Sequence, residues 1–337
     1  MCIIFWAQDA QYQLILGANR DEFLSRPTTR AAFHSFSRDS LSPTPDSEHP
    51  ILSGLDLTAG GTWLGVSLPA AFSSSTNERL RFATLTNYTE VLPPVPRPSR
   101  GELVKDWLYS TSGEGMDGYL SSVEQAKESY AGFNLVLGSL TAGGEWEMGY
   151  VSNREPAGSE GRKVQMPVEG AALAVSNATL GVREGEDEWP KVKEGCKALQ
   201  SAVLGAQGEQ DLVQKLWTVL SYAHPTPIRH RLHLRHTILV QPTFIDPTAP
   251  LPANPPPFAE AGSSPAPPPT QLPAGLEGKV EGEGGYWYAT RVQTVLLVER
   301  EREGKVRVSL REREGYILND EGKPEWKPEE RLFEFVV

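Results

Sequence analysis

The chain has 337 residues, of which 39% are hydrophobic and 22% charged, a balance typical of a globular protein that buries a substantial core. Its formal net charge of −11 argues against general affinity for nucleic acid or for an anionic membrane. The two cysteines, Cys2 and Cys196, cannot form a disulfide framework, so we expect a reducing compartment.

Targeting signals are sparse. Because no run of about 18 uncharged apolar residues occurs, we predict no transmembrane segment. The first 16 residues also lack the basic region and the cleavage site of a secretory signal. We therefore predict a cytoplasmic protein that is not secreted. Early arginines and serines leave a mitochondrial destination open, although acidic residues interrupt that pattern.

The chain begins with two short apolar stretches, residues 2–7 and 12–18, which predict a β-hairpin with its turn near residue 10. Folding back at that turn places Cys2 opposite residues 17–19. The polar residues that follow the second apolar stretch are then expected beside the N-terminus: Asn19, Arg20 and Asp21.

Apolar periodicity predicts the elements that follow. Residues 35–50 form a polar loop. Strands are expected at 60–68, 81–90, 132–140, 145–151, 171–177, 231–240, 286–300, 305–311 and 331–337. Helices are expected after Ser99, which has capping-box spacing to Glu102, over 115–130, from Trp189-Pro190, and over 209–223. Strands and helices that alternate in blocks favour a layered α+β fold in which helices sandwich the sheets.

Residues 241–285 differ in composition from the rest of the chain. Proline, glycine and alanine dominate this segment, and large apolar residues are almost absent after Phe258. Strand-like sequence resumes directly afterwards. We therefore predict one domain over residues 1–337, with 241–285 as a disordered or extended insertion within it.

Cys2 is a candidate nucleophile. If the initiator methionine is removed, this residue carries a thiol and a free α-amine, and an α-amine titrates at about 7.7–8, close enough to neutral to take the thiol proton. A cysteine at the start of a buried strand is, however, more often a packing residue. The neighbouring candidates must therefore decide between the two interpretations.

Carbonyl attack also needs donors for the developing oxyanion, and asparagine side chains can supply them. Asn87 ends the strand-like sequence LTN, and Asn177 ends VSN. Asp21 is placed to orient the amine and thiol, and Arg291 is placed to pair with Asp21 or to bind an anionic substrate. Each of these residues also has an ordinary structural interpretation as a turn cap or an ion pair.

Several motifs in chain order resemble one known family. MCIIFW, GANRDEF, GGTWLGV, LTNYTE, SRGELV, GFNLVLG, VSNATL, WPKV and YATRVQTVLL are similar to the NRDE family, the transport and Golgi organisation 2 protein family. The matches extend from residue 1 to about residue 298. The resemblance implies an N-terminal nucleophile (Ntn) hydrolase fold, a four-layer αββα sandwich of antiparallel sheets.

The resemblance also implies a set of site residues. Its nearest functional pattern is that of bile-salt hydrolases and penicillin V acylases, which use an N-terminal cysteine with an aspartate, two asparagines and an arginine. The implied catalytic residues are Cys2, Asp21, Asn87, Asn177 and Arg291. The implied ligand-binding residues are Asn19, Arg20, Asp21, Glu22 and Arg26.

Three functions stay open. The first is a cysteine hydrolase acting on the amide or thioester bond of a small acylated compound. The second is a carrier or chaperone of an amphipathic anionic ligand such as haem or acyl-coenzyme A, with haem as cargo and no resident cofactor. The third is a scaffold in Golgi organisation and secretion, associated peripherally with Golgi or mitochondrial membranes.

A metal site is not expected. The sequence HRLHLRH invites one, but on the predicted strand His233 faces away from His230 and His236. Cys196 lies in a predicted helix and is expected to be inert.

Overall fold

A computed structural model describes residues 2–36, 41–46, 48, 50–72, 77–88, 96–110, 113–155, 161–181, 188–225, 228, 231–246, 276, 278–300 and 302–337. Within these residues, two large antiparallel sheets and two pairs of helices account for most of the regular structure. This arrangement confirms the predicted α+β class with antiparallel sheets.

The strands have these bounds: β1 Ile3–Ala7, β2 Tyr12–Phe23, β3 Ala32–His34, β4 Ile51–Ser53, β5 Leu64–Ser67, β6 Glu78–Asn87, β7 Phe133–Thr141, β8 Trp146–Ser152, β9 Arg162–Val164, β10 Ala172–Val175, β11 Thr243–Ile245, β12 Tyr286–Glu299, β13 Arg307–Glu314, β14 Tyr316–Leu318, β15 Pro324–Trp326 and β16 Glu330–Val336. The α-helices are α1 Gly101–Leu108, α2 Met116–Ala126, α3 Pro190–Leu204 and α4 Glu209–Leu220. Short 3₁₀ turns are η1 Pro69–Ala71, η2 Lys127–Ser129 and η3 Arg231–His236.

The first sheet joins the two ends of the sequence. Its strand order is β10-β1-β2-β12-β13-β16, with β11 added to β12. β1 and β2 form the predicted hairpin, and Ile3 pairs with Asn19, which puts Cys2 one residue beyond the expected register. β2 then pairs with β12, so residues 12–23 lie beside residues 286–299. The first apolar hairpin is therefore at the centre of the sheet.

The second sheet is a meander. Its strands follow one another in sequence order from β3 to β9, and β6 and β7 form its long central pair. β6 ends at Asn87, as predicted for the LTN sequence. Its end therefore lies at the same edge as the start of β7 at Phe133.

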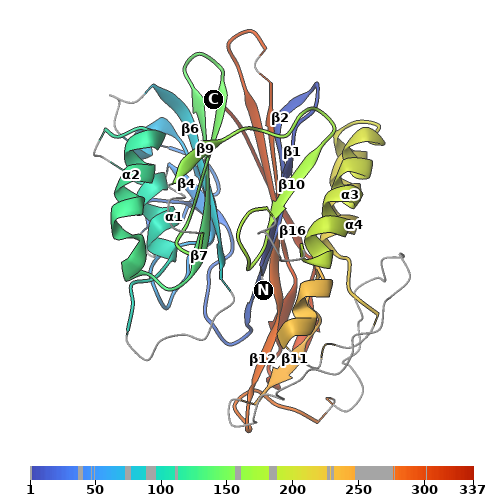
Figure 1. Cartoon of the computed structure of the whole chain (residues 1–337). Helices are drawn as coiled ribbons and strands as arrows, with labels where there is room; N and C mark the ends of the chain where they lie inside the picture. The colour runs from blue at the N-terminus through green and yellow to red at the C-terminus, as the bar shows by residue number, and fades with distance from the viewer. Residues whose placement is uncertain are drawn as a thin grey trace.

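Helices cover the outer face of each sheet, and the two sheets face each other (Figure 1). α3 and α4 pack on the first sheet, where Leu216 and Leu220 contact the apolar face of β1, β2 and β12. α1 and α2 pack on the second sheet through residues such as Trp107 and Leu120. The helices are amphipathic, as their 3–4 spacing predicted, because only one face of each meets a sheet.

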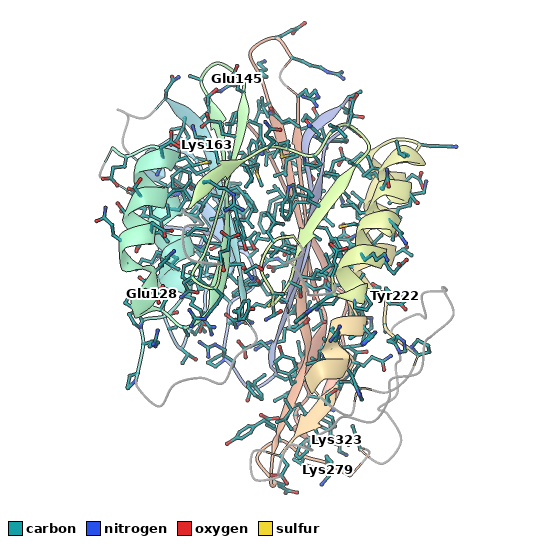
Figure 2. The ribbon with its side chains drawn as sticks, in the orientation of Figure 1. Glu128, Glu145, Lys163, Tyr222, Lys279 and Lys323 are labelled. Carbon is teal, nitrogen blue, oxygen red and sulfur yellow. The ribbon has the colours of Figure 1, made fainter. Side chains whose placement is uncertain are left out.

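Side chains fill the space between the sheets (Figure 2). Trp6, Leu16, Phe82 and Leu296 are among the buried residues of this interior. Full burial of each such side chain stabilises the fold by about 1.5–3 kcal/mol before conformational entropy is counted. Because β1 and the first half of β2 are covered on both faces, the sequences of Ile3–Ala7 and of residues 14–18 are continuously apolar instead of alternating.

One predicted strand is wrong. Residues 231–240 were expected to alternate as a half-buried strand, but residues 231–236 form the turn η3 and the chain then continues irregularly. Local hydrogen bonds replace a strand ladder here, because the main-chain N–H groups of Ile238 and Leu239 both donate to the carbonyl of Tyr222 at 3.1 and 2.8 Å.

The predicted capping box at Ser99 and Glu102 is also wrong. Helix α1 begins at Gly101 after Arg100, and the Ser99 hydroxyl accepts a hydrogen bond from the Gly101 N–H at 3.3 Å instead. The segment is fixed by close backbone packing: a Cβ on Gly61 would lie 2.5 Å from the main chain of Gly101.

Ordered structure extends into the predicted insertion from both sides. At its start, β11 lies within the predicted insertion and pairs with β12, which follows the insertion. At its end, residues 278–285 form turns that lead into β12. Residues 247–275 and 277, which contain most of the predicted insertion, lie outside the described residues.

Candidate functional site

Cys2 lies between the two neighbours of β1. Ile3 pairs with Asn19 on β2, and Ile4 pairs with Val175 on β10. Continuing both registers by one or two residues places Cys2 beside Arg20 on one side and Asn177 on the other. The main-chain carbonyl of Cys2 accepts a hydrogen bond from the Ser176 hydroxyl at 2.6 Å, which fixes this end of the strand.

Cys2 as a whole residue is partly exposed and lines a pocket, while its thiol is buried. Its Sγ lies 3.9 Å from the main-chain oxygen of Asp21, the length of a weak S–H···O contact. Burial raises the pKa of the Cys2 thiol, Asp21 adds to that rise, and Arg20 opposes it. The thiol is therefore mostly protonated at neutral pH and needs a base to become a strong nucleophile.

Asp21 is buried and held by β12. Its Oδ1 accepts a hydrogen bond of 2.6 Å from the Thr290 hydroxyl, whose oxygen also accepts the main-chain N–H of Val240 at 2.8 Å. The Tyr288 hydroxyl donates to the main-chain oxygen of Asp21 at 3.2 Å. Thr290 therefore orients the carboxylate of Asp21, and Tyr288 holds its main chain where the Cys2 thiol contacts it.

Arg20 faces the space between the sheets. Its guanidinium carbon lies 4.2 Å from the centre of the Trp63 ring, and its Nη2 lies 3.7 Å from the Glu22 carboxylate. Arg20 and Asp21 therefore point to opposite faces of β2, as their adjacency predicted. The Nη1 of Arg20 is buried and has no hydrogen-bond partner among the described residues.

Arg26 is paired with an acid on the second sheet's side of the pocket. Its guanidinium contacts Asp56 at 2.7 Å and lies 3.9 Å from Glu22. Burial works against the charge on Asp56, but the hydrogen bond and the charge of Arg26 lower the pKa of Asp56. Arg26 and its two acidic partners therefore line one side of the pocket.

The two predicted oxyanion asparagines are brought together by a buried network. Thr86 donates to the main-chain oxygen of Ser176 at 2.5 Å, so the residues just before Asn87 and Asn177 are bonded to each other. The Asn134 amide donates to Thr86 Oγ1 and to the Ser176 carbonyl at 3.0 Å each. This network connects the second sheet with the end of β10.

Of the predicted catalytic residues, Cys2, Asp21 and Asn87 line a pocket of 380 Å³, whereas Asn177 is not among its lining residues. Its lining residues are Cys2, Arg20, Asp21, Glu22, Arg26, Asp56, Ala59, Thr62, Trp63, Leu85, Asn87, Arg97, Pro98, Ser99, Arg100, Gly101 and Ala131. The pocket has the size of a small-molecule site and carries charges of both signs. A second hollow of 10 Å³ adjoins Cys2 between the sheets, with room for about one water molecule.

The sequence matches the Transport and Golgi organisation 2 family over residues 1–314. The chain belongs to this family. Its relatives include the Transport and Golgi organization protein 2 homolog of Bos taurus, which is 34% identical over 232 residues, or 66% of this chain and 72% of the bovine protein. The Homo sapiens homolog is 32% identical with the same coverage. The Drosophila melanogaster protein is 30% identical over 145 residues, covering 40% of this chain and 45% of the fly protein. The predicted family resemblance is confirmed.

Within this Transport and Golgi organisation 2 chain, Asn19 points away from the pocket toward the helices. Its amide donates to the main-chain oxygens of Leu220 and Ile238 at 2.8 and 3.0 Å. Gln293 donates to its Oδ1 at 3.3 Å. These bonds anchor the end of α4 to β2, so Asn19 supports the sheet from behind.

Arg291 does not pair with Asp21. It donates to the main-chain oxygen of Arg26, while Asp21 accepts from Thr290. Burial and the like charge of Arg20 lower the pKa of Arg291 to about 10. A bulge in the β2–β12 pairing between Thr290 and Val292 separates the two side chains, and Arg291 lies outside the residues that line the pocket.

Sequence reasoning missed the groups that orient the site from a distance. Thr290 and Tyr288 hold Asp21, Ser176 holds Cys2, and Asn134 holds Ser176. All four lie in the quoted motifs YATRVQTVLL, VSNATL and GFNLVLG, but the motifs assigned them no role. Their roles became visible only through pairings between distant segments.

The described residues contain no group of three or more His, Cys, Asp or Glu side chains arranged to hold a metal ion. His236 lies near His224, with ring centres 6.1 Å apart, and His230 is outside the described residues. The helices that the structure describes are too short or too polar to cross a membrane.

Proposed function

We propose that this protein is a Transport and Golgi organisation 2 type protein in Golgi organisation and secretion, whose pocket at Cys2 hydrolyses an amide or thioester bond of a small anionic acyl compound. The supporting observation is that Cys2, the oriented Asp21 and the Asn87 strand end line one 380 Å³ pocket. The names of the relatives support the cellular role.

The reaction needs removal of Met1, which leaves a free α-amine on Cys2. This amine takes the thiol proton, and Sγ attacks the acyl carbonyl carbon while Asn87 and Asn177 donate to the oxyanion. The C–N or C–S bond then breaks, and the leaving amine or thiol receives the proton. Water attacks the resulting thioester on Cys2, which releases the carboxylic acid and restores the thiol.

The layer order supports assignment to the Ntn-hydrolase type of αββα sandwich. In that architecture the first residue of a central strand opens into a cleft between the sheets. Here β1 is a central strand of the first sheet, and the residue before it lines the pocket. The fold alone does not decide the reaction, because one fold hosts many functions.

Two measurements test the hydrolase proposal. Intact-mass analysis of natively expressed protein is expected to show a chain beginning at Cys2. With a panel of p-nitrophenyl esters and acyl thioesters, Cys2→Ala is expected to lower turnover at least about 10³-fold while the thermal midpoint stays unchanged. Cys196→Ala is the matched control, because burial raises the pKa of that thiol to about 12 and it lies on α3. Retention of Met1, or equal turnover in Cys2→Ala, would contradict hydrolysis.

A second candidate is a carrier of haem or acyl-coenzyme A. The raised pKa of the Cys2 thiol and the unpartnered Nη1 of Arg20 favour it, because they describe a site that holds an anion without activating the thiol. Titration with haem and palmitoyl-coenzyme A is expected to show saturable micromolar binding that weakens in Arg20→Met. Equal binding in the variant would remove Arg20 from the ligand site.

We extend the same proposal to location: a cytoplasmic protein with peripheral Golgi association. Fractionation of cells that express the full chain tests it. Recovery in the Golgi fraction that high salt releases is expected, whereas recovery only in the mitochondrial matrix would contradict it.

A further inference from the structure

A buried lysine lies close to the Cys2 site on the helix side of the first sheet. Lys191 is 1% exposed and occupies the first turn of α3, directly after Pro190. A lysine is almost never fully buried unless an acidic group compensates its charge. The positive end of the helix dipole makes a cation at this position still less favourable. A specific partner must therefore offset both costs.

Helix α3 lies along β1, because a Cβ on Gly195 would be 2.4 Å from the Phe5 ring, and Lys191, one turn earlier, is on the side of the strand's Cys2 end. Burial lowers the pKa of Lys191 to about 8, while the charges of Asp21 and Cys2 oppose that decrease. Asp21 is 4% exposed and faces the helix side of β2, opposite to Arg20. The lysine and the carboxylate therefore share one low-dielectric region, in which their attraction is strong.

One apolar cluster, formed by Leu234 and Val240, has a neighbour of Lys191 and a neighbour of Asp21 packed against it. The Lys191 ammonium lies 5.8 Å from the centre of the Trp189 ring, and Trp189 packs in the same apolar cluster as Tyr288. Tyr288 in turn donates its hydroxyl to the main chain of Asp21. Burial, together with Asp21 and Cys2, raises the pKa of Tyr288, so its hydroxyl stays protonated. The turn η3, which packs on α3, adds His233 to the groups near this region.

We propose that Lys191 is a positioning residue of the Cys2 site, whose buried ammonium orients the Asp21 carboxylate and stabilises the thiolate that forms at Cys2. The inference rests on the proposed function of this pocket. Lys191 does not line the pocket, so it acts through Asp21 and Cys2 and does not touch the substrate.

The test compares Lys191→Met with Lys191→Arg in a Cys196→Ala background, in which Cys2 is the remaining thiol. The rate of iodoacetamide alkylation is followed from pH 6 to pH 9.5. Loss of a nearby cation raises a thiol pKa by about one unit, so Lys191→Met is expected to react about tenfold more slowly at pH 7. Lys191→Arg retains the charge and is expected to stay within about threefold of the parent, since a pairing role tolerates a second cation.

A purely structural lysine would give a different result. Thermal unfolding identifies variants that have lost the fold. If folded Lys191→Met has the pH–rate profile of the parent, or if Lys191→Arg falls equally far, the proposal is wrong.

A measurement on the parent protein keeps the proposal testable if Lys191→Met does not fold. With ¹³C-labelled lysine, one Cε resonance is expected to titrate near pH 8 and to shift when Cys2 is alkylated. Absence of any lysine resonance that responds to alkylation would overturn the role of Lys191.

The two proposals fail separately. If the parent turns over none of the acyl thioesters while Lys191→Met still slows alkylation, hydrolysis is wrong and the positioning role stands. If turnover depends on Cys2 but neither readout responds to Lys191, the positioning role is wrong and hydrolysis stands.

Discussion

The two sheets contribute different things to the same pocket. The first sheet supplies the groups that can react or titrate, with Cys2, Arg20 and Asp21 next to one another on β1 and β2. The second sheet and α1 supply walls such as Trp63 and Arg100, whose polar groups are largely committed to the protein itself. The Arg100 guanidinium, for example, donates to the Gly132 carbonyl at 3.1 Å. The titratable groups of the pocket therefore come from the first sheet and much of its wall from the second. The buried hydrogen bonds of Asn134, which we call the joint, connect the two sheets.

Removal of the joint is expected to have the largest effect. The side chain of Asn134 is fully buried, and it bonds Thr86, the Ser176 and Ala178 carbonyls, and the Tyr150 hydroxyl. Asn134→Ala leaves these groups without a partner, so the free energy of unfolding is expected to fall by about 4 kcal/mol in urea denaturation.

Asn153→Ala is the matched control for the joint. Asn153 is also buried, but its amide bonds main-chain groups near Tyr130 and Phe133, within the second sheet and its connections. Both variants are expected to lose stability, and only Asn134→Ala is expected to change the alkylation rate of Cys2. Equal alkylation rates in the two variants would show that the joint does not tune the site.

A buried acid on the first sheet is expected to make its stability depend on pH. Glu312 accepts the Ala31 N–H at 2.7 Å, and burial raises its pKa from 4.5 to about 7. A folded pKa above the unfolded value contributes stability that is complete below pH 4.5 and is lost as pH rises to 7. The span corresponds to about 3 kcal/mol.

Glu312→Gln is expected to remove that dependence. The difference in unfolding free energy between the variant and the parent should change across pH 4.5–7 and stay constant above it. Glu314→Gln, at a partly exposed pair with Arg30, is the control and should give a smaller slope. A difference independent of pH would contradict the raised pKa.

Asn87, at the end of β6, tests whether the second sheet takes part in the proposed reaction or only forms the pocket wall. If the second sheet contributes one oxyanion donor, Asn87→Ala is expected to lower kcat about 10²-fold, or about 2.7 kcal/mol, with little change in KM. Asn87→Asp keeps the size but loses the donor and serves as the second variant. A change confined to KM would instead make Asn87 a wall residue.

The smallest expected effect is at the contact between the sheets that Arg20 makes. Trp63→Phe weakens the ring beneath the guanidinium and is expected to lower the unfolding free energy by about 1 kcal/mol. A double-mutant cycle with Arg20→Met isolates the pair from the packing of the ring. A coupling energy near zero would assign the loss to packing alone.

Local sequence patterns predicted most of the fold. The Cys2 hairpin, the long strands and the four α-helices follow from apolar periodicity, because each element is decided by burial on one or both faces. The short strands β3, β4 and β9 were missed, since three residues carry too little periodicity. Residues 231–240 alternate in sequence as a strand would, but they form a turn followed by irregular chain that is bonded to the Tyr222 carbonyl.

The candidate site was predictable only along β1 and β2. Adjacent strands have a register, so the neighbourhood of Cys2 and Asp21 follows from the length of one turn. Thr290, Ser176 and Lys191 reach the site through pairings with strands and helices more than 150 residues away, and no local pattern encodes such pairings. The same distance explains why Arg291, predicted to pair with Asp21 or to bind an anionic substrate, instead donates to the main chain of Arg26.

The register of β1 has a practical consequence for recombinant work. Because Cys2 lines the pocket, an affinity tag added before it would begin at the pocket and would remove the free amine that the proposed reaction requires. The opposite terminus, at the end of the edge strand β16, lies away from the N-terminus (Figure 1). The proposed hydrolysis should therefore be tested on protein tagged at the opposite terminus, because inactivity of an N-terminally tagged sample would not count against it.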